Sequence, residues 1–224
     1  FAATILFPFS SWPTGTVEVR AGIIDNGQTI TTGSYDKLYN GMHIIGDHGI
    51  GGNLGNTVTG FYVRKYLDPS YTEEDASTSK GNVQSYKELR YGEVLLNYAE
   101  AAMELGRSDE ARDAINKIRS RAGIKALTMA EMTKNSVRHE REVELAFEGG
   151  HRYWDIRRWH IADKLISNTK FTALYPYYVF ADGAYIFKTE KVGYALTFYP
   201  NLYYERIPKG EIDKDPKLIQ NPNY

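Results

Sequence analysis

The stretch YGEVLLNYAEAAMELGRSDEARDAINKIRSRAG, residues 91–123, decides the fold of the helical part of this chain. Apolar and aromatic residues in its first half recur in steps of four and three, which predicts one shared helix face: Tyr91, Leu95, Tyr98, Ala102 and Leu105. We expect this helix to begin near Ser85 and to end at Gly106. Ser108 is a good N-cap for a second helix, which ends at Gly123. The stretch therefore predicts a helical hairpin.

The hairpin matches a tetratricopeptide-type unit of roughly 34 residues over 92–125. Ala99, Ala102 and Ala111 stand at its small-residue positions, where small side chains let two helices cross closely. About three repeats are needed for a stable stack, and the sequence holds no second copy. We therefore expect the hairpin to dock on another part of the protein. An ordinary helical hairpin in a mixed domain is the alternative.

Further helices are expected after the hairpin, so that the helical part covers residues 85–166. Thr128-Met-Ala-Glu131 fits a capping box. It predicts a third helix that bends near Asn135 and runs to Phe147. A fourth helix is expected over Tyr153–Ile166.

The first 84 residues are expected to form short strands and loops. Ala3–Phe9, Thr16–Ile24 and Val58–Tyr66 have the composition of strands or extended segments. Two long loops are expected, one rich in glycine and one polar: 41–60 and Asp68–Gly81.

The last segment, residues 167–224, is expected to wrap the surface with little regular structure, because four prolines interrupt it after residue 199. Its start is an exception. Phe171–Phe180 and Ala184–Thr189 are expected to pair as a hairpin around the turn Ala181-Asp-Gly183. Taken together, the patterns predict a mainly α fold with irregular β structure, in which a tetratricopeptide-type helical hairpin packs on a loop-rich, short-stranded region.

Composition excludes several classes of protein. The 224 residues hold 27 Lys and Arg against 28 Asp and Glu, and a net charge of -1 argues against a nucleic-acid binder that relies on a positive field. The absence of cysteine excludes disulfides, thiolate metal sites and a cysteine nucleophile within this chain. No apolar run of about 18 residues marks a membrane-spanning helix. The unusual count is aromatic: 18 Tyr, 9 Phe and 3 Trp.

Three glutamates offer the first candidate for chemistry. Glu140, Glu144 and Glu148 fall on one helix face, and paired carboxylates can hydrolyse glycosidic bonds. Five arginines lie close in sequence and would neutralise them: Arg138, Arg141, Arg152, Arg157 and Arg158. A structural network of arginines and glutamates is therefore the favoured interpretation, with glycoside hydrolysis as the alternative.

Metal and cofactor patterns are weak, so no cofactor and no metal is expected. His43, Asp47 and His48 fall within one loop and could meet a metal ion, but such neighbours are common by chance. The glycines of 49–55 suggest a phosphate loop, yet a strand-like segment follows where a helix is required.

Residues 152–159, RYWDIRRW, interleave basic and aromatic side chains. This pattern fits a nucleic-acid face. We favour a buried packing helix instead, because Trp154 and Arg158 share a helix face and Asp155 can pair with Arg158.

Exposed aromatics are the remaining candidates for a binding site. Trp12 lies in a turn between strand-like segments, and Tyr35 and Tyr39 flank a polar segment. Aromatic rings on loops can stack on sugar rings, so these three are candidate carbohydrate-binding residues. For each of them, packing on the core of its own domain is the alternative.

Six sequence blocks, in order over residues 59–224, resemble the SusD/RagB family of outer-membrane nutrient-binding lipoproteins. They are Thr59–Tyr66 (TGFYVRKY), Tyr91–Ala101 (YGEVLLNYAEA), Asn116–Gly123 (NKIRSRAG), His139–Gly149 (HEREVELAFEG), Arg152–Trp159 (RYWDIRRW), and Ile207–Asp213 with Gln220–Tyr224. Departures from the family pattern are small: Gly150 is an insertion, Gly92 replaces Ala, and Asn223 replaces Gly.

The resemblance implies a SusD-like fold and a protein that binds glycan or another nutrient at the cell surface and is not an enzyme. It implies a surface-exposed lipoprotein of the outer membrane that delivers its ligand to a SusC-type TonB-dependent transporter. It also implies that the chain is the C-terminal portion of a longer protein. The lipid anchor and the other helical repeats would then lie upstream.

Two further functions stay open from the sequence. A helical-repeat scaffold that binds protein, without affinity for sugars, is the main alternative. The glycosidase needs two inward carboxylates roughly 5–10 Å apart in a cleft. It fails if Glu140, Glu144 and Glu148 are bonded to arginines.

Overall fold

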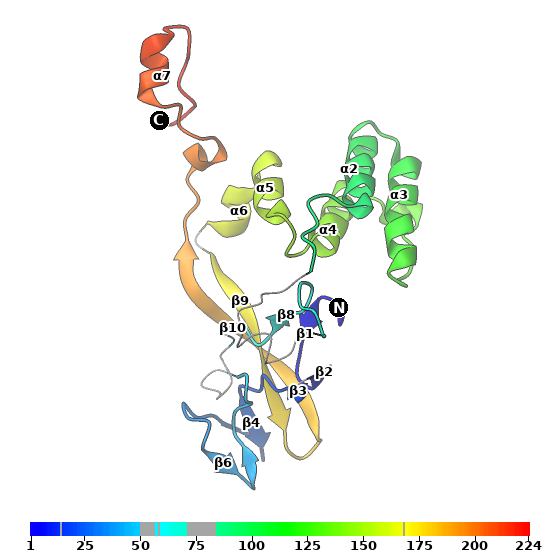
Figure 1. Cartoon of the computed structure of the whole chain (residues 1–224), viewed down its shortest axis with the longest axis vertical. Coiled ribbons are helices and arrows are strands. Elements are labelled where there is room, and N and C mark those ends of the chain that lie inside the picture. The colour runs from blue at the N-terminus through cyan, green and yellow to red at the C-terminus, as the bar shows by residue number, and fades with distance from the viewer. Residues whose placement is uncertain (14, 50–56, 58, 71–83, 168) are drawn as a thin grey trace. The chain divides into compact units, whose positions relative to one another are not determined.

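The computed structural model describes residues 1–13, 15–49, 57, 59–70, 84–167 and 169–224 (Figure 1). The chain divides into two compact units. The strand-rich unit comprises 1–84 and 165–198, and the helical unit comprises 85–164 and 199–224. Residues 71–81 of the predicted polar loop Asp68–Gly81 lie outside the described residues, as do 50–56 and 58 of the predicted glycine-rich loop 41–60. The described part of 41–60 is not all loop, because Met42–His43 form a short strand.

The strand-rich unit is built on one four-stranded sheet with the order β10-β9-β4-β5. Its strands are β4 (Gly22–Asp25), β5 (Gln28–Ile30), β9 (Thr169–Val179) and β10 (Ala184–Leu196). The described residues of this unit also form three small antiparallel pairs: β1 (Ile5–Leu6) with β8 (Tyr62–Val63), β2 (Ser10–Trp12) with β3 (Gly15–Val17), and β6 (Leu38–Tyr39) with β7 (Met42–His43).

The hairpin predicted from the turn chemistry of Ala181-Asp-Gly183 is confirmed. Ala184 pairs with Val179 across the turn, and Gly183 adopts a positive φ of 61°. The strands run further than predicted, to a register shift between Val192 and Leu196. β4 joins the hairpin in parallel, with Ile23 opposite Tyr178. The sheet therefore unites segments from both ends of the strand-rich unit.

Gly60 marks a close approach between two segments of this unit. Its φ is +84°, and a Cβ added there would collide with the carbonyl oxygen of Leu174 in β9. A residue with a side chain would need both a left-handed backbone and a shift of β9. Glycine at this position lets residues 59–63 lie against the sheet.

The helical unit holds α2 (Tyr91–Glu104), α3 (Ser108–Arg121), the 3-10 helix η1 (Met129–Glu131), α4 (Lys134–Glu144) and α5 (His151–Arg158). After α5, α6 (Ala162–Ile166) crosses the boundary between the units, and η2 (Pro200–Tyr203) and α7 (Lys209–Lys214) follow. α2 contacts α3 and α4, and the three helices lie together in Figure 1. Their core is a single cluster of Leu95, Leu96, Ala99, Ala102, Ala111, Ala114, Ile115, Ile118, Met132, Val137 and Leu145.

The predicted helical hairpin is present, but two of its details are wrong. The first helix begins at Tyr91 rather than near Ser85, because Arg90 is extended and its guanidinium is held by Glu144 and Glu148. The predicted single face is in fact two faces. Leu95 and Ala102 are buried, whereas the other three predicted members are exposed: Tyr91, Tyr98 and Leu105. Contacts with α3 and α4 select the buried face.

Helix ends also differ from the predictions. Ser108 is the first helical residue of α3 rather than its cap, and its hydroxyl donates to Met103 Sδ. The capping box at Thr128 is confirmed, yet it caps only η1, and Thr133 caps α4 separately. The fourth predicted helix is two helices, because His160 between α5 and α6 has a φ of 51°.

The tail contains more regular structure than its prolines predict. Pro200 opens η2, and Pro208 directly precedes α7. Proline suits these positions because the first turn of a helix needs no backbone donor there. Among the described residues, no helix is long and apolar enough to cross a membrane.

Candidate functional site

The candidate site lies in the strand-rich unit, around the buried side chain of Arg20. The side chains of Val17 and Val19 are buried in the core. Glu18 lies between them in the chain, and Arg20 follows Val19. The Arg20 side chain is 7% exposed. Its guanidinium donates to the carbonyl oxygens of His43 at 2.7 Å and Ile44 at 3.3 Å and pairs with Glu18 at 3.3 Å. This cation therefore has its partners within the protein.

Three tyrosines around this site each direct the hydroxyl at a carboxylate. Tyr185 on β10 donates to Glu18 at 2.6 Å, and Tyr39 on β6 donates to Asp25 at 2.6 Å. The carboxylate of Asp47 is the main cause that raises the pKa of the Tyr35 hydroxyl. Hydrogen bonds from the hydroxyls of Tyr39 and Tyr185 fix the orientation of these two rings.

The carboxylates keep these hydroxyls protonated. The carboxylate of Asp47 raises the pKa of Tyr35, and the bond to Asp25 raises the pKa of Tyr39. Burial is the largest cause that raises the pKa of Tyr185, followed by its bond to Glu18. A phenolate beside a carboxylate would add a second negative charge, so the neutral hydroxyl is favoured.

A continuous line of ring contacts runs over the end of the β9–β10 hairpin. Phe9 meets Tyr185 with ring centroids 5.3 Å apart, and Tyr185 meets Tyr178 at 5.5 Å. Phe180 lies 6.3 Å from Tyr178 and 5.8 Å from Tyr39. Edge-to-face contacts of this kind stabilise the cluster. Phe9 is exposed, and the other four rings are half-buried.

The predicted aromatic candidates do not all meet in this cluster. Tyr39 belongs to the line of rings, and Tyr35 lies beside it on the same segment, stacked on His43 at 3.9 Å. Trp12 lies on β2, half-buried against the core cluster Leu6, Val17 and Val19. Within residues 1–13 and 15–49, no ring contact joins Trp12 to either tyrosine.

The histidines of the predicted metal alternative have other partners. His43 Nδ1 donates to the carbonyl oxygen of Tyr35 at 2.7 Å, and the ring of His48 packs edge-on against Tyr62. Across the part of the chain that the structure describes, no three acidic, histidine or cysteine side chains gather as a metal site would require.

In the helical unit, the three glutamates of the hydrolase alternative are all bonded to arginines. Glu140 pairs with Arg119 at 2.7 Å, and Glu144 pairs with Arg90 at 2.6 Å and Arg121 at 2.7 Å. Glu148 pairs with Arg90 at 2.6 Å. The network joins the segment before α2 to α3, α4 and the residues after α4. A network of arginines and glutamates is present as predicted, but its arginines are Arg90, Arg119 and Arg121 rather than the five expected from the sequence. The condition set for rejecting the acid–base pair is met.

A second ion-pair group centres on Asp155 and Glu100. Arg141 and Arg158 both bind Asp155, at 2.6 and 2.9 Å, and Arg158 also binds Glu100 at 2.5 Å. Burial raises the pKa of Glu100, but hydrogen bonds from Arg158 and Trp159 outweigh burial and the net pKa is lowered. The residue is therefore an ionised structural anchor rather than a general acid.

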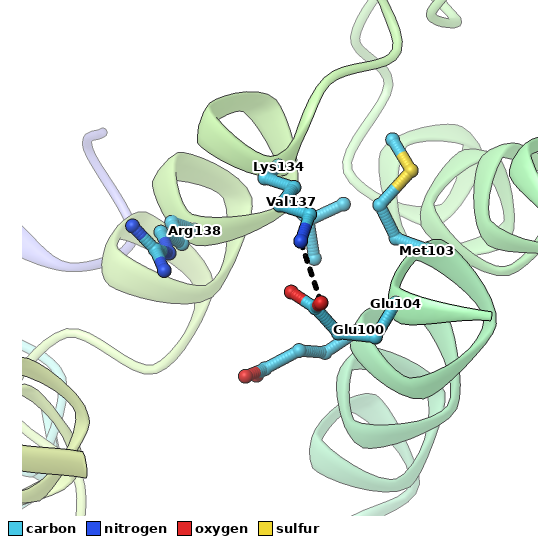
Figure 2. A pocket seen from close by; sticks show the side chains of 6 residues that line it. All are labelled: Glu100, Met103, Glu104, Lys134, Val137 and Arg138. Atoms are coloured by element: carbon cyan, nitrogen blue, oxygen red, sulfur yellow. Dashed lines mark hydrogen bonds and ion pairs between the residues drawn. The ribbon is translucent and has the colours of Figure 1, made fainter. Parts of the chain in front are cut away.

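A shallow hollow between α2 and α4 adjoins Glu100 (Figure 2). Its lining comprises Glu100, Met103, Glu104, Lys134, Val137 and Arg138. The ion pair between Lys134 and Glu104, 2.6 Å long, links the two helices there. Mixed charge and an open shape make it a poor site for a sugar or a cofactor.

Helix α5 only partly follows its prediction as a buried packing helix. Asp155 and Ile156 are buried, and Asp155 pairs with Arg158 as predicted. Trp154, predicted to lie on a buried packing helix, is 62% exposed. It touches Tyr153 edge-on, with ring centroids 4.9 Å apart.

Sequence reasoning missed most of the cluster: Phe9, Glu18, Arg20, Tyr178, Phe180 and Tyr185. One available signal was the alternation Val17-Glu-Val-Arg20, in which polar residues interrupt a strand-like run. The other was the aromatic richness on both sides of the turn 181–183. Neither signal says that the two segments meet.

Comparisons with known proteins agree on one family. The family model described as the SusD family matches residues 1–224. A solved structure named BT4246 is 27% identical with a TM-score of 0.64, and the match covers 99% of this chain and 35% of that chain. Its selenomethionine form gives 27% identity and a TM-score of 0.63, with 100% and 37% covered. The chain thus spans about a third of their length. The comparison with curated protein sequences gives no match.

Proposed function

The chain belongs to the SusD family, and on this premise we propose that it takes part in the non-catalytic binding of a glycan nutrient at the cell surface. Recognition would use aromatic rings that stack on sugar faces and polar groups that bond to sugar hydroxyls. The observation that carries the proposal is the line of rings through Tyr39 and Tyr185, each held by a carboxylate.

Of the three aromatic residues predicted from the sequence, Tyr39 and Tyr35 are the ones that we propose as glycan contacts at this cluster. The hydroxyl of Tyr39 is held by Asp25, so ligand binding costs this ring little side-chain entropy. Trp12 remains a proposed contact at a separate place on the same unit. Its half-buried ring also supports the core, so its substitution affects stability as well as binding.

The finer parts of the family role are proposals too. We propose delivery to a SusC-type TonB-dependent transporter, location on the outer membrane through a lipid anchor, and a place for this chain as the C-terminal portion of a longer protein. The tetratricopeptide-type description of the α2–α3 hairpin belongs with them. It is supported by alanines buried where the two helices cross, Ala99, Ala102, Ala111 and Ala114.

A protein-binding scaffold is the second candidate function, and one observation favours it. The outward face of α2 carries Tyr91, Val94 and Tyr98 in steps of three and four, and all three are exposed. Leu105, directly after the helix, is exposed as well. The exposed face of α3 is polar by contrast, with Asp109, Glu110, Asp113 and Lys117.

A glycan array followed by calorimetry on the whole chain separates the two functions. Glycan binding that is lost in Tyr39→Ala, with the fold intact by circular dichroism, supports the proposal. The matched control is Tyr194→Ala, because Tyr194 is 90% exposed on β10. Absence of binding to every glycan, together with specific capture of a protein partner that Val94→Asp abolishes, would establish the scaffold instead.

A further inference from the structure

Phe9 has an unusual backbone for an aromatic residue. Its φ is +64°, in the left-handed region that favours glycine and asparagine. Hydrogen bonds hold the turn around it: the Phe9 amide donates to Val17 O at 3.0 Å, and the Phe7 amide donates to Ser10 Oγ at 2.8 Å. Such strain persists only where surrounding structure imposes it, and it is concentrated at functional sites.

The strained backbone presents a ring that the core does not use. Phe9 is 58% exposed, and its ring contact is with Tyr185 at the end of the aromatic line. The fold would be served as well by glycine, which adopts this φ without strain and exposes no apolar surface. The position therefore carries two local costs, strain and exposure, for a ring placed beside Tyr185.

We propose that Phe9 is a further ligand contact that extends the aromatic line, and that this site takes neutral rather than acidic glycans. The inference rests on the proposed glycan-binding function and deepens it. The exposed ring of Phe9, whose centroid lies 5.3 Å from that of Tyr185, adds one stacking face for a sugar ring at the end of the line.

Charge around the rings supports a neutral ligand. The hydroxyls of Tyr35 and Tyr39 face the carboxylates of Asp47 and Asp25, and these two carboxylates would repel a uronate or a sulfate. The cation that contacts the line is Arg20, 6.0 Å from the ring of Tyr178. It is buried and already bonded to Glu18 and to two backbone carbonyls. An acidic sugar would therefore meet the carboxylates without gaining this cation.

The test compares variants of the whole chain on neutral and acidic probes. The neutral probes are cellohexaose, maltohexaose and mannohexaose, and the acidic probes are oligogalacturonate and a sulfated galactan. Phe9→Gly removes the ring and relieves the strain. It should lower affinity for the bound neutral glycan about tenfold without lowering the thermal midpoint of unfolding. Phe9→Tyr should keep the affinity.

Phe171→Ala is the matched control, because Phe171 is 57% exposed on β9 of the same unit. It should bind as the original chain does. Wild-type affinity in Phe9→Gly overturns the role of Phe9 and leaves the proposed function standing. Tighter binding of the acidic probes overturns the neutral class. If the original chain binds no glycan at all, the proposed function itself fails, and this inference fails with it.

Discussion

Tyr185 donates a hydrogen bond of 2.6 Å to Glu18, a residue 167 positions earlier in the chain. The same hydroxyl accepts a hydrogen bond from Arg20 at 3.3 Å. The three side chains form a polar relay that connects β10 to the segment after β3. The relay holds the aromatic line in place, because Tyr185 carries the ring contacts with both Phe9 and Tyr178.

Removal of the Tyr185 hydroxyl should destabilise the strand-rich unit. Tyr185→Phe leaves Glu18 without this donor, and a bond to a charged group contributes about 2 kcal/mol. Urea unfolding followed by circular dichroism measures the loss. Tyr194→Phe, at a ring that is 90% exposed, is the control and should leave the midpoint unchanged. Equal midpoints for both variants would contradict the relay.

The same hydroxyl predicts a loss of stability at alkaline pH. Burial and Glu18 raise the pKa of Tyr185 above its unfolded value of about 10. Above pH 10 the unfolded chain releases this proton and the folded chain keeps it, so stability falls as pH rises toward the folded pKa. Urea titrations at several pH values should show the advantage over Tyr185→Phe constant below pH 10 and shrinking above it. A constant advantage up to pH 12 would oppose this assignment.

Arg141 should be among the most sensitive side chains of the helical unit. Its side chain is 6% exposed, and it binds Asp155 and Asn97, each at 2.6 Å. Arg141→Ala leaves a buried carboxylate, and we expect a loss of about 3 kcal/mol because Arg158 still faces Asp155. The control is Lys134→Ala, whose exposed pair with Glu104 contributes at most about 1 kcal/mol. If chemical denaturation gives similar losses of unfolding free energy for Arg141→Ala and Lys134→Ala, the structural importance of Arg141 is contradicted.

The glutamates of the helical unit should support stability rather than hydrolysis. Glu144 holds Arg90 and Arg121, so Glu144→Gln should lower the free energy of unfolding by about 2 kcal/mol. The unaltered chain should release no reducing ends from any glycan that it binds. Hydrolysis that Glu140→Gln or Glu148→Gln abolishes would reinstate the glycosidase.

Gly60 should tolerate no side chain. Gly60→Ala combines a left-handed φ with a collision against Leu174 O, and we expect a loss of about 2 kcal/mol or more. Gly27→Ala is the matched control: its φ is +75°, and nothing lies within 4 Å of the added Cβ. It should lose only the strain, about 1 kcal/mol. Thermal unfolding of the two variants separates the collision from the strain.

Helix positions were predictable because their signals are local. The periodicity of 91–123 located α2 and α3, and Thr128 with Glu131 formed the predicted capping box. The start of α2 was not predictable from its neighbours. Arg90 is held extended by Glu144 and Glu148, which lie 54 and 58 residues away.

The candidate site was predictable only in part. Loop position and composition pointed to Tyr35 and Tyr39, and both lie at the cluster. Phe9 and Arg20 were not predicted as site residues. Phenylalanine rarely adopts a positive φ, and arginine is rarely buried. Sites of this kind are where local rules are expected to fail.

The family blocks, the helical hairpin and the strand pair around Ala181-Asp-Gly183 were predictable from the sequence. Each depends on residues that lie close together in the chain or on motifs that can be recognised in the sequence. The arginine partners of the three glutamates, Arg90, Arg119 and Arg121, depend on the tertiary structure. So does the parallel pairing of β4 with β9, in which Ile23 lies opposite Tyr178. That pairing brings Glu18 and Arg20 to Tyr185. The physical reason is that contacts between distant segments leave no periodic signal in either segment, since they depend on which strands share a sheet.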